Sequence, residues 1–241
     1  MIVAIILSII ICTFLIYSII PTYYFKLISN NVIRKTNQPN KIMLTFDDGP
    51  DERYTNQLLD VLAENDVQAT FFVVAKNAFG NHAIIKRMQD EGHEIGLHSL
   101  EHENAMFFDR RYTKEDFKQS ITIMNDLNCD VTFYRPPWGH TNIFSYHYMK
   151  KYGLKMILWD VMAQDWKDNA TADIIADKLM KRTKPTSIIC LHDAGENSGG
   201  AKDAPLNTIA ALRIAIPQLK NKGYEFITAK GLHYEKKQRK Q

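Results

Sequence analysis

Residues 41–50 read KIMLTFDDGP, and this stretch decides the fold. Its first six residues form a mostly apolar run of the kind that favours a buried strand. The run ends at Asp47 and Asp48, and Gly49 and Pro50 then favour a turn. We therefore predict a strand that carries two adjacent carboxylates at its carboxyl end.

Short apolar runs alternate with longer amphipathic segments along the rest of the chain. Seven runs are strand candidates, at Lys41–Phe46, Ala69–Val74, His93–Leu97, Val131–Tyr134, Lys155–Trp159, Ser187–Leu191 and Tyr224–Ile227. The helix candidates include Thr55–Asn65, Thr113–Leu127, Thr171–Arg182 and Pro205–Asn221. Three of these helices open with a threonine able to cap the first turn. Repeated strand and helix units within about 190 residues predict an α/β fold with one closed or nearly closed barrel.

The first 20 residues, MIVAIILSIIICTFLIYSII, carry no charge. As a helix they are long enough to cross a hydrocarbon core of about 30 Å. The stretch lacks the basic start and the small-residue cleavage site of a signal peptide, so we predict an uncleaved transmembrane anchor at 1–21. A linker at 22–40, the main domain at 41–232 and a basic tail at 233–241 complete the expected organisation.

Basic residues flank this anchor on its C-terminal side, at Lys26, Arg34 and Lys35. By the positive-inside rule they would hold that side of the membrane segment in the cytoplasm. This preference opposes an extracytoplasmic location for the main domain.

Charge and cysteine content argue against several partners. A net charge of +3 without a nucleic-acid-binding motif predicts no nucleic-acid partner. Three cysteines, of which Cys12 lies in the anchor, imply no disulfide framework, and no feature indicates an obligate protein partner. The basic tail is typical of a solvated terminus, with contact to anionic lipid or wall polymer as the alternative.

Polar residues follow the predicted strands at their carboxyl ends. They are Asp47 and Asp48 after the first strand, His98 after the third, Arg135 after the fourth, Asp160 and Asp165 after the fifth, and His192 after the sixth. In a β/α barrel these ends meet on one face, where catalytic groups collect. We therefore expect one active site on that face.

His98 and His102, in HSLEH, have the i, i+4 spacing that places two imidazoles on one face of a helical turn. A surface pair is the alternative, but a carboxylate from another strand end can supply a third ligand. Two histidines and one aspartate leave a coordination position open for water, which is typical of a catalytic metal. The adjacent carboxylates of Asp47 and Asp48 in TFDDGP can form a merely solvated turn. Otherwise one carboxylate binds the metal and the other takes a proton from water.

Arg135 and His192 each have a structural alternative. Proline after Arg135 favours extended backbone there, and the guanidinium can hold Asp47 ionised unless it is a surface arginine. His192, in ICLHD, leaves a buried strand and can be a core histidine. Near a carboxylate its pKa would rise, which suits a general acid.

Five stretches taken together resemble the ordered motifs of polysaccharide deacetylases, the carbohydrate esterase family 4 or NodB-homology enzymes. They are TFDDG at 45–49, HSLEH at 98–102, RPPWG at 135–139, DW at 165–166 and LH at 191–192. The resemblance covers Lys41 to Leu232. It implies a distorted, TIM-like (β/α)7 barrel and an Asp-His-His site for a divalent metal, commonly Zn²⁺, with Co²⁺, Mn²⁺ or Ni²⁺ as alternatives.

The resemblance also implies roles by motif position. Asp47 is the expected base, His192 the acid that protonates the leaving amine, and Asp48, His98 and His102 the metal ligands. Arg135 would orient Asp47, and Asp165 would tune His192. Trp138, where the family often has tyrosine, would offer its backbone N–H to the oxyanion, and Trp166 and Leu191 would wall the acetyl pocket.

The expected function is metal-dependent hydrolysis of N-acetyl groups on N-acetylglucosamine-containing glycans, with peptidoglycan first. Chitin-like oligomers, an exopolysaccharide or a lipid-linked sugar are alternative substrates. Two alternatives come from other classes: a non-haem iron oxygenase, which uses two histidines and a carboxylate, and an inactive carbohydrate-binding module. The protein is expected in the cell membrane with one span and an extracytoplasmic catalytic domain.

Overall fold

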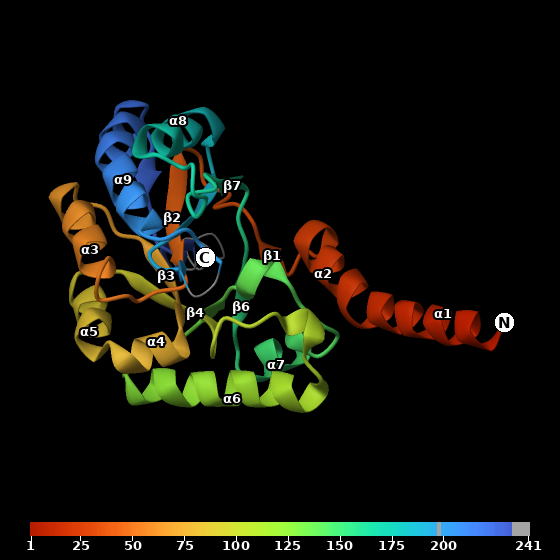
Figure 1. Cartoon of the computed structure of the whole chain (residues 1–241). Helices are drawn as coiled ribbons and strands as arrows, with labels where there is room; N and C mark the ends of the chain where they lie inside the picture. Colours follow the sequence, from red (N-terminus) through yellow and green to blue (C-terminus); the bar gives the residue numbers. More distant parts are fainter. Residues whose placement is uncertain (197–198, 233–241) are drawn as a thin grey trace, which may run out of the picture.

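The computed structural model describes residues 1–196 and 199–232, and the predicted basic tail at 233–241 lies outside the described residues. Figure 1 shows an α/β domain from which one N-terminal helix extends outward. Helices surround the strands on their outer side, as the alternation of segments predicts.

One curled sheet forms the centre of the domain. Its strands are β1 Val32–Ile33, β2 Lys41–Asp47, β3 Thr70–Val74, β4 Glu94–Ser99, β5 Phe133–Tyr134, β6 Lys155–Ile157, β7 Val161–Met162, β8 Ile188–His192 and β9 Glu225–Phe226. The order is β1-β6-β5-β4-β3-β2-β8-β7, with β9 beside the start of β2, and the pairings between these strands are parallel. The fold is the expected distorted barrel. The seven predicted strands are found, and the two-residue strands β1 and β7 are additional.

The helices of the domain are α3 Thr55–Glu64, α4 Ala75–Gly80, α5 His82–Asp90, α6 Arg110–Asp126, α7 Ser145–Lys151, α8 Ala172–Arg182 and α9 Ala204–Asn221, with short 3-10 turns at Ala105–Phe107 and Pro137–Gly139. Of the three threonine caps, Thr171 is confirmed, since its side chain accepts a hydrogen bond from the Ile174 N–H. The other two are wrong. Asp109 caps α6 one turn before Thr113, and Thr55 donates to Asp193 instead.

Strand alternation decides which side chains face the interior of the barrel. In β2, Ile42, Leu44 and Phe46 pack in the larger core cluster, whereas Met43 joins Phe72, Phe133, Ile157 and Ile188 in the smaller one. Because side chains alternate along a strand, Asp47 lies on the same face as Met43. The apolar interior therefore ends in a carboxylate at the carboxyl end of β2.

The segment 22–40, expected as a linker, is folded against the domain. The N-terminal helix runs through α1 Ile2–Phe14, a π-helical turn Leu15–Ile19, α2 Ile20–Tyr23 and a second π-helical turn Tyr24–Ile28. It satisfies the length and apolarity of a membrane span. Arg34 donates to the carbonyls of Lys26 (2.7 Å) and Ser29 (3.0 Å), which satisfies acceptors at the end of the helix. Val32–Ile33 then pairs with β6.

Candidate active site

A pocket of about 360 Å³ lies at the carboxyl ends of β2, β4 and β8. Seven of the ten residues that were given a role in the site line it: Asp47, Asp48, His98, His102, Trp138, Trp166 and His192. Arg135, Asp165 and Leu191 are fully buried behind the pocket wall. The lining also includes residues that sequence reasoning missed, among them Lys26, Trp159, Met162 and Cys190.

Asp48, His98 and His102 have ligand atoms that all lie within 4.8 Å of one another. Oδ1 of Asp48 is 2.9 Å from Nε2 of His102 and 3.4 Å from Nε2 of His98. Two ligands bound tetrahedrally at about 2.1 Å from a zinc ion lie about 3.4 Å apart. Oδ1 of Asp48 is buried and has no hydrogen-bond partner among the described residues. A buried carboxylate oxygen of this kind, facing two imidazoles, fits a divalent metal.

The HSLEH stretch brings both imidazoles to the site without forming a helical turn. The prediction that His98 and His102 share one face of a helix is therefore wrong. His98 lies in β4, and His102 lies in the following loop with a left-handed backbone (φ 58°). Ser99 Oγ accepts a hydrogen bond from the His102 N–H at 2.8 Å and so fixes the turn. The two imidazole centroids are 5.1 Å apart.

Neighbouring groups orient the three candidate ligands. Nδ1 of His98 lies 2.7 Å from the carbonyl oxygen of Arg135, which favours a proton on Nδ1 and leaves the lone pair of Nε2 facing Asp48. Burial alone would raise the pKa of Asp48, but the imidazoles of His102 and His98 and the charge of His192 lower it below its ordinary value. An ionised carboxylate at Asp48 suits a ligand of a divalent metal.

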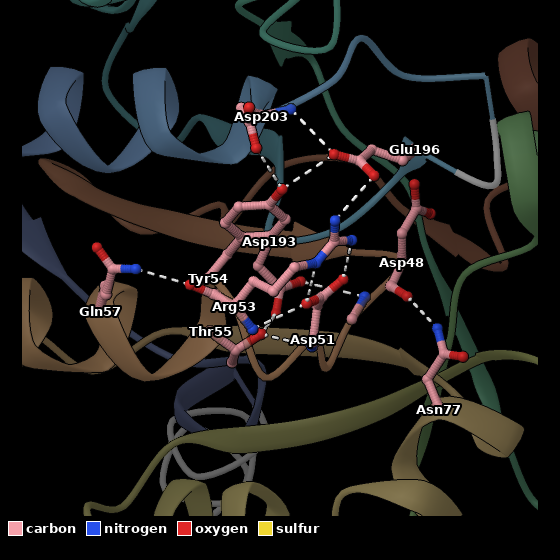
Figure 2. Close-up of polar contacts among 11 residues, drawn as sticks. Asp48, Asp51, Arg53, Tyr54, Thr55, Gln57, Asn77, Asp193, Glu196 and Asp203 are labelled. Atoms are coloured by element: carbon pink, nitrogen blue, oxygen red, sulfur yellow. Dashed lines mark hydrogen bonds and ion pairs between the residues drawn. The ribbon is translucent and has the colours of Figure 1, made fainter.

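The turn after β2 depends on Asp193, which sequence reasoning missed although it follows His192 in LHD. Asp193 accepts hydrogen bonds from the Gly49 N–H (3.2 Å) and from Thr55 Oγ1 (2.7 Å). Asn77 donates to the carbonyl oxygen of Asp48 (2.9 Å), whose backbone has a φ of 81°. Figure 2 shows Asp193 and Asn77 supporting the two sides of this turn. The turn thereby presents the Asp48 carboxylate to the histidines.

Asp47 lies beside the ligand set and is held by a buried cation. Nη1 of Arg135 is 2.7 Å from both Oδ1 of Asp47 and Oγ1 of Thr45. The guanidinium also packs over the Phe72 ring at 4.2 Å. Cys190 donates its S–H to the other oxygen of Asp47 at 3.4 Å. These contacts give the Asp47 carboxylate a defined orientation.

Asp47, Cys190 and His192 form a second group whose ligand atoms lie within 4.8 Å of one another. Burial raises the pKa of Cys190 well above its ordinary value, so its side chain is a neutral thiol. Asp47 is already paired with the Arg135 guanidinium, whereas Oδ1 of Asp48 is buried without a hydrogen-bond partner among the described residues. The group with two imidazoles and Asp48 therefore fits a metal better.

His192 is paired with Asp47 across strands β8 and β2 and lines the same pocket as the candidate ligands. Its Nδ1 is 2.9 Å from Oδ1 of Asp165, and Thr208 donates to the other oxygen of that carboxylate at 3.0 Å. Burial alone would lower the pKa of His192, but Asp165, Asp48 and Asp47 together raise it to about 10. His192 is thus a cation at neutral pH and can donate a proton.

The aromatic residues expected to contact substrate lie on the pocket rim. The Trp138 ring meets the His102 ring edge to face at 4.5 Å and is 44% exposed. The Trp166 ring meets the His192 ring in the same manner at 5.1 Å. Leu191 does not line the pocket, because it alternates with Cys190 and His192 along β8 and its side chain packs in the larger core cluster.

Asp160, expected at a carboxyl strand end, lies away from the pocket. Its carboxylate accepts a hydrogen bond from the Ile188 N–H (2.8 Å), at the opposite end of β8 from His192. The unpredicted strand β7 begins directly after it and pairs with β8. Asp165, which follows β7, is the residue of this region that reaches the site.

Comparisons with known proteins identify the family of the chain. Residues 34–157 match the family model described as polysaccharide deacetylase. A peptidoglycan-N-acetylglucosamine deacetylase of Bacillus cereus is 32% identical over 198 residues, which cover 81% of this chain and 89% of that protein. The corresponding deacetylase PgdA of Listeria monocytogenes is 33% identical over 208 residues, or 85% of this chain, but this match spans 41% of the longer PgdA chain.

The fold is also similar to that of solved structures. A crystal structure of a peptidoglycan N-acetylglucosamine deacetylase in complex with 4-naphthalen-1-yl-N-oxidanyl-benzamide matches with a TM-score of 0.76 and 30% identity, covering 83% of this chain and 91% of that one. The family model, the relatives and the solved structure all name polysaccharide or peptidoglycan deacetylases. The chain therefore belongs to the polysaccharide deacetylases, the hydrolases of carbohydrate esterase family 4.

Proposed function

We propose that this protein removes N-acetyl groups from N-acetylglucosamine residues of peptidoglycan in a metal-dependent reaction. The observation that carries the proposal is that Asp47, paired with the buried Arg135, and His192, held as a cation, line the same pocket as the three candidate ligands. A base and an acid in these states suit hydrolysis of an amide. The relatives that share this family are named for the same reaction on the same polymer.

Asp48, His98 and His102 would hold the metal, with zinc favoured by two nitrogen ligands and one carboxylate. When bound, a divalent ion supplies Lewis-acid activation of water and of the acetamide carbonyl. The three side chains contribute one negative charge.

Asp47 acts as the base. It accepts the proton of the attacking water, and Arg135 and Cys190 hold its two oxygens in place while it does so. The Arg135 charge stabilises the carboxylate in the resting enzyme, and loss of the base would leave substrate binding intact.

His192 acts as the acid. Its Nδ1 is engaged by Asp165, which leaves Nε2 free to donate a proton to the leaving amine. The Trp138 N–H is assigned to the developing oxyanion, and the Trp166 ring beside His192 to the wall around the acetyl methyl group. Acetate and the free amine of the sugar are the products.

The N-terminal helix is assigned as a membrane anchor with the catalytic domain outside the cytoplasm. Its length and apolar character support the anchor, and the wall polymer named for the relatives supports the outer location. A reporter enzyme fused after Gln241 tests the orientation. Activity restricted to a reporter that works only in the cytoplasm would contradict the extracytoplasmic assignment.

Mass spectrometry of N-acetylglucosamine oligomers and intact peptidoglycan tests the reaction. We expect loss of acetyl groups with the metal-loaded protein, loss of activity after chelation and recovery on addition of Zn²⁺. Oxygen uptake without acetate release would favour the oxygenase instead. Glycan binding without acetate release by the metal-loaded protein would identify a binding module.

A further inference from the structure

The second half of the N-terminal helix is seated on the domain through polar side chains. Ser18 Oγ donates to the Met106 carbonyl (2.6 Å), and Thr22 Oγ1 both donates to and accepts from the backbone of Thr141 (2.9 Å each). Both helix side chains are almost completely buried. These contacts fix the rotation of the helix relative to the catalytic pocket.

Lys26 lies four residues beyond Thr22, as Thr22 lies four beyond Ser18, so the three side chains share one face of the helix. That face is turned to the domain, and Lys26 lines the same pocket as the candidate metal ligands. Its side chain covers Gly139, where an added Cβ would lie 2.7 Å from Lys26 Cε. Gly139, with a φ of 67°, thus leaves the space through which the ammonium reaches the pocket.

No carboxylate pairs with the Lys26 ammonium among the residues that the structure describes. His140, its titratable neighbour in the RPPWGH stretch, has a pKa lowered by burial and by the charge of Lys26. Asp47, which lines the pocket, is already paired with Arg135, and Asp165, behind the pocket wall, is paired with His192.

The remaining carboxylate of the pocket, Asp48, is the proposed ligand of a divalent cation. A bound ion brings more positive charge than Asp48 neutralises. Lys26 therefore adds positive charge to a pocket that is already cationic once the metal is present. Its ammonium group is not needed to neutralise the acidic residues of the pocket. A partly buried cation in such a pocket is complementary to an anion supplied by the substrate.

We propose that Lys26 is a substrate-binding residue that takes an anionic oxygen group, a carboxylate or a phosphate, carried by the glycan close to the acetylated sugar. This inference rests on the proposed deacetylase function and narrows its substrate to charged glycans. A muramic acid or peptide carboxylate in peptidoglycan and the phosphate of a lipid-linked sugar share this chemistry. Neutral chitin-like oligomers lack it.

The full-length protein in detergent tests the proposal with the variants Lys26→Gln and Lys26→Arg. Lys118→Gln is the matched control, because Lys118 is 61% exposed on α6 and does not line the pocket. Three substrates are compared: a neutral N-acetylglucosamine oligomer, a peptidoglycan fragment with free carboxylates, and an N-acetylglucosamine oligomer with a terminal phosphate. Steady-state acetate release separates kcat from KM.

We expect Lys26→Gln to raise KM about tenfold on at least one anionic substrate, as for loss of a charge-assisted hydrogen bond, and to leave the neutral oligomer within about twofold. The anionic substrate affected identifies the source of the group. Lys26→Arg retains most of the affinity because it keeps the charge, and Lys118→Gln changes no parameter. Equal losses on all three substrates, or no loss on either anionic one, would overturn the assignment.

Binding measured by tryptophan fluorescence separates this inference from the proposed function, because Trp138 and Trp159 line the pocket. If the wild-type protein releases no acetate from any substrate, the deacetylase proposal fails. The anionic fragments would still bind more weakly to Lys26→Gln than to wild type if Lys26 has the role assigned to it. Equal binding would reject that role as well.

Discussion

Nδ1 of His192 lies 2.9 Å from Oδ1 of Asp165, and the His192 N–H donates to Oδ2 of the same carboxylate at 2.8 Å. Side chain and backbone of His192 are thus tied to one fully buried anion. The arrangement fixes the ring orientation and supports the charged form of the imidazole. The proton-donating half of the proposed reaction depends on it.

Replacing Asp165 by asparagine removes the charge but keeps the size of the side chain. Burial then lowers the pKa of His192 with less opposition, so the pKa falls from its value of about 10. Because the general acid must be protonated, activity is lost as pH rises through this pKa. We expect the alkaline limb of the kcat/KM profile to move to lower pH in Asp165→Asn.

The pH dependence of the free energy of unfolding follows from the same pKa shift of His192. A histidine with a raised pKa stabilises the fold fully below its ordinary pKa of about 6.5, and this contribution is lost as pH rises through about 10. Asp177→Asn is the control, since Asp177 pairs with Lys181 on the surface. An unmoved alkaline limb in Asp165→Asn would show that His192 does not titrate in the reaction.

Replacing Asp47 and replacing His98 should affect metal binding differently, although both should reduce turnover. Asp47→Asn should keep the bound metal, because the three proposed ligands remain, and should lower kcat about 10²- to 10⁴-fold through loss of the base. His98→Ala should lose both metal and turnover. Metal content by mass spectrometry and acetate release measure the two effects, with His82→Ala on the exposed part of α5 as a control.

Full metal retention in His98→Ala would reject the ligand assignment. Metal loss in Asp47→Asn would place that residue in the coordination shell, where the geometry does not put it. The two variants therefore separate the proposed base, Asp47, from a proposed metal ligand, His98.

Arg135 is predicted to stabilise the fold as well as the base. Its guanidinium is fully buried and pairs with Asp47 and Thr45 at 2.7 Å. Arg135→Met leaves the Asp47 carboxylate unpaired in the interior, which costs about 3–5 kcal/mol. Denaturant unfolding measures this, and Arg213→Met, which breaks an exposed pair with Glu64, should cost about 0–1 kcal/mol.

A double-mutant cycle tests the interaction between Arg135 and Asp47. If Arg135 stabilises the protein chiefly through Asp47, Arg135→Met in an Asp47→Asn background should cost much less than in the wild type. Equal costs in both backgrounds would mean that the packing of Arg135 over Phe72, at 4.2 Å, accounts for its effect.

The sequence was sufficient to predict those parts of the fold that depend on local patterning. Long apolar runs such as Ile188–His192 are strands because both faces are buried, and the motifs at their ends converge because parallel strands share a carboxyl edge. The two-residue strands β1 and β7 were not predicted because, unlike the equally short β5 and β9, they do not lie within a longer run of strand-forming residues. They form through pairing with distant strands.

Side-chain direction was the weaker part of the site prediction. Leu191 was expected in the pocket, yet strand alternation places Cys190 and His192 there and turns Leu191 outward. The period of two along β8 could have indicated this. Lys26 was missed because it lies outside the motifs, although the spacing of Ser18, Thr22 and Lys26 in an apolar helix is a signal of a polar docking face.

Gly49 is predicted to be irreplaceable in the turn that presents Asp48. An added Cβ would lie 2.1 Å from Oδ2 of Asp193, a buried side chain that is already held by Thr55 and the Gly49 N–H. Gly49→Ala must therefore displace Asp193 or the turn itself, at a cost of about 1–3 kcal/mol. Because the turn positions a proposed ligand, metal affinity should fall together with stability.

Gly80→Ala is the matched control, since an added Cβ there meets nothing within 4 Å. It should leave metal affinity unchanged and stabilise the protein slightly by reducing the freedom of the unfolded chain. Thermal unfolding with and without Zn²⁺ measures both properties. If Gly49→Ala lowers stability in the metal-free protein but binds Zn²⁺ as tightly as wild type, Asp48 reaches the metal independently of the turn, and the role given to Asp193 is wrong.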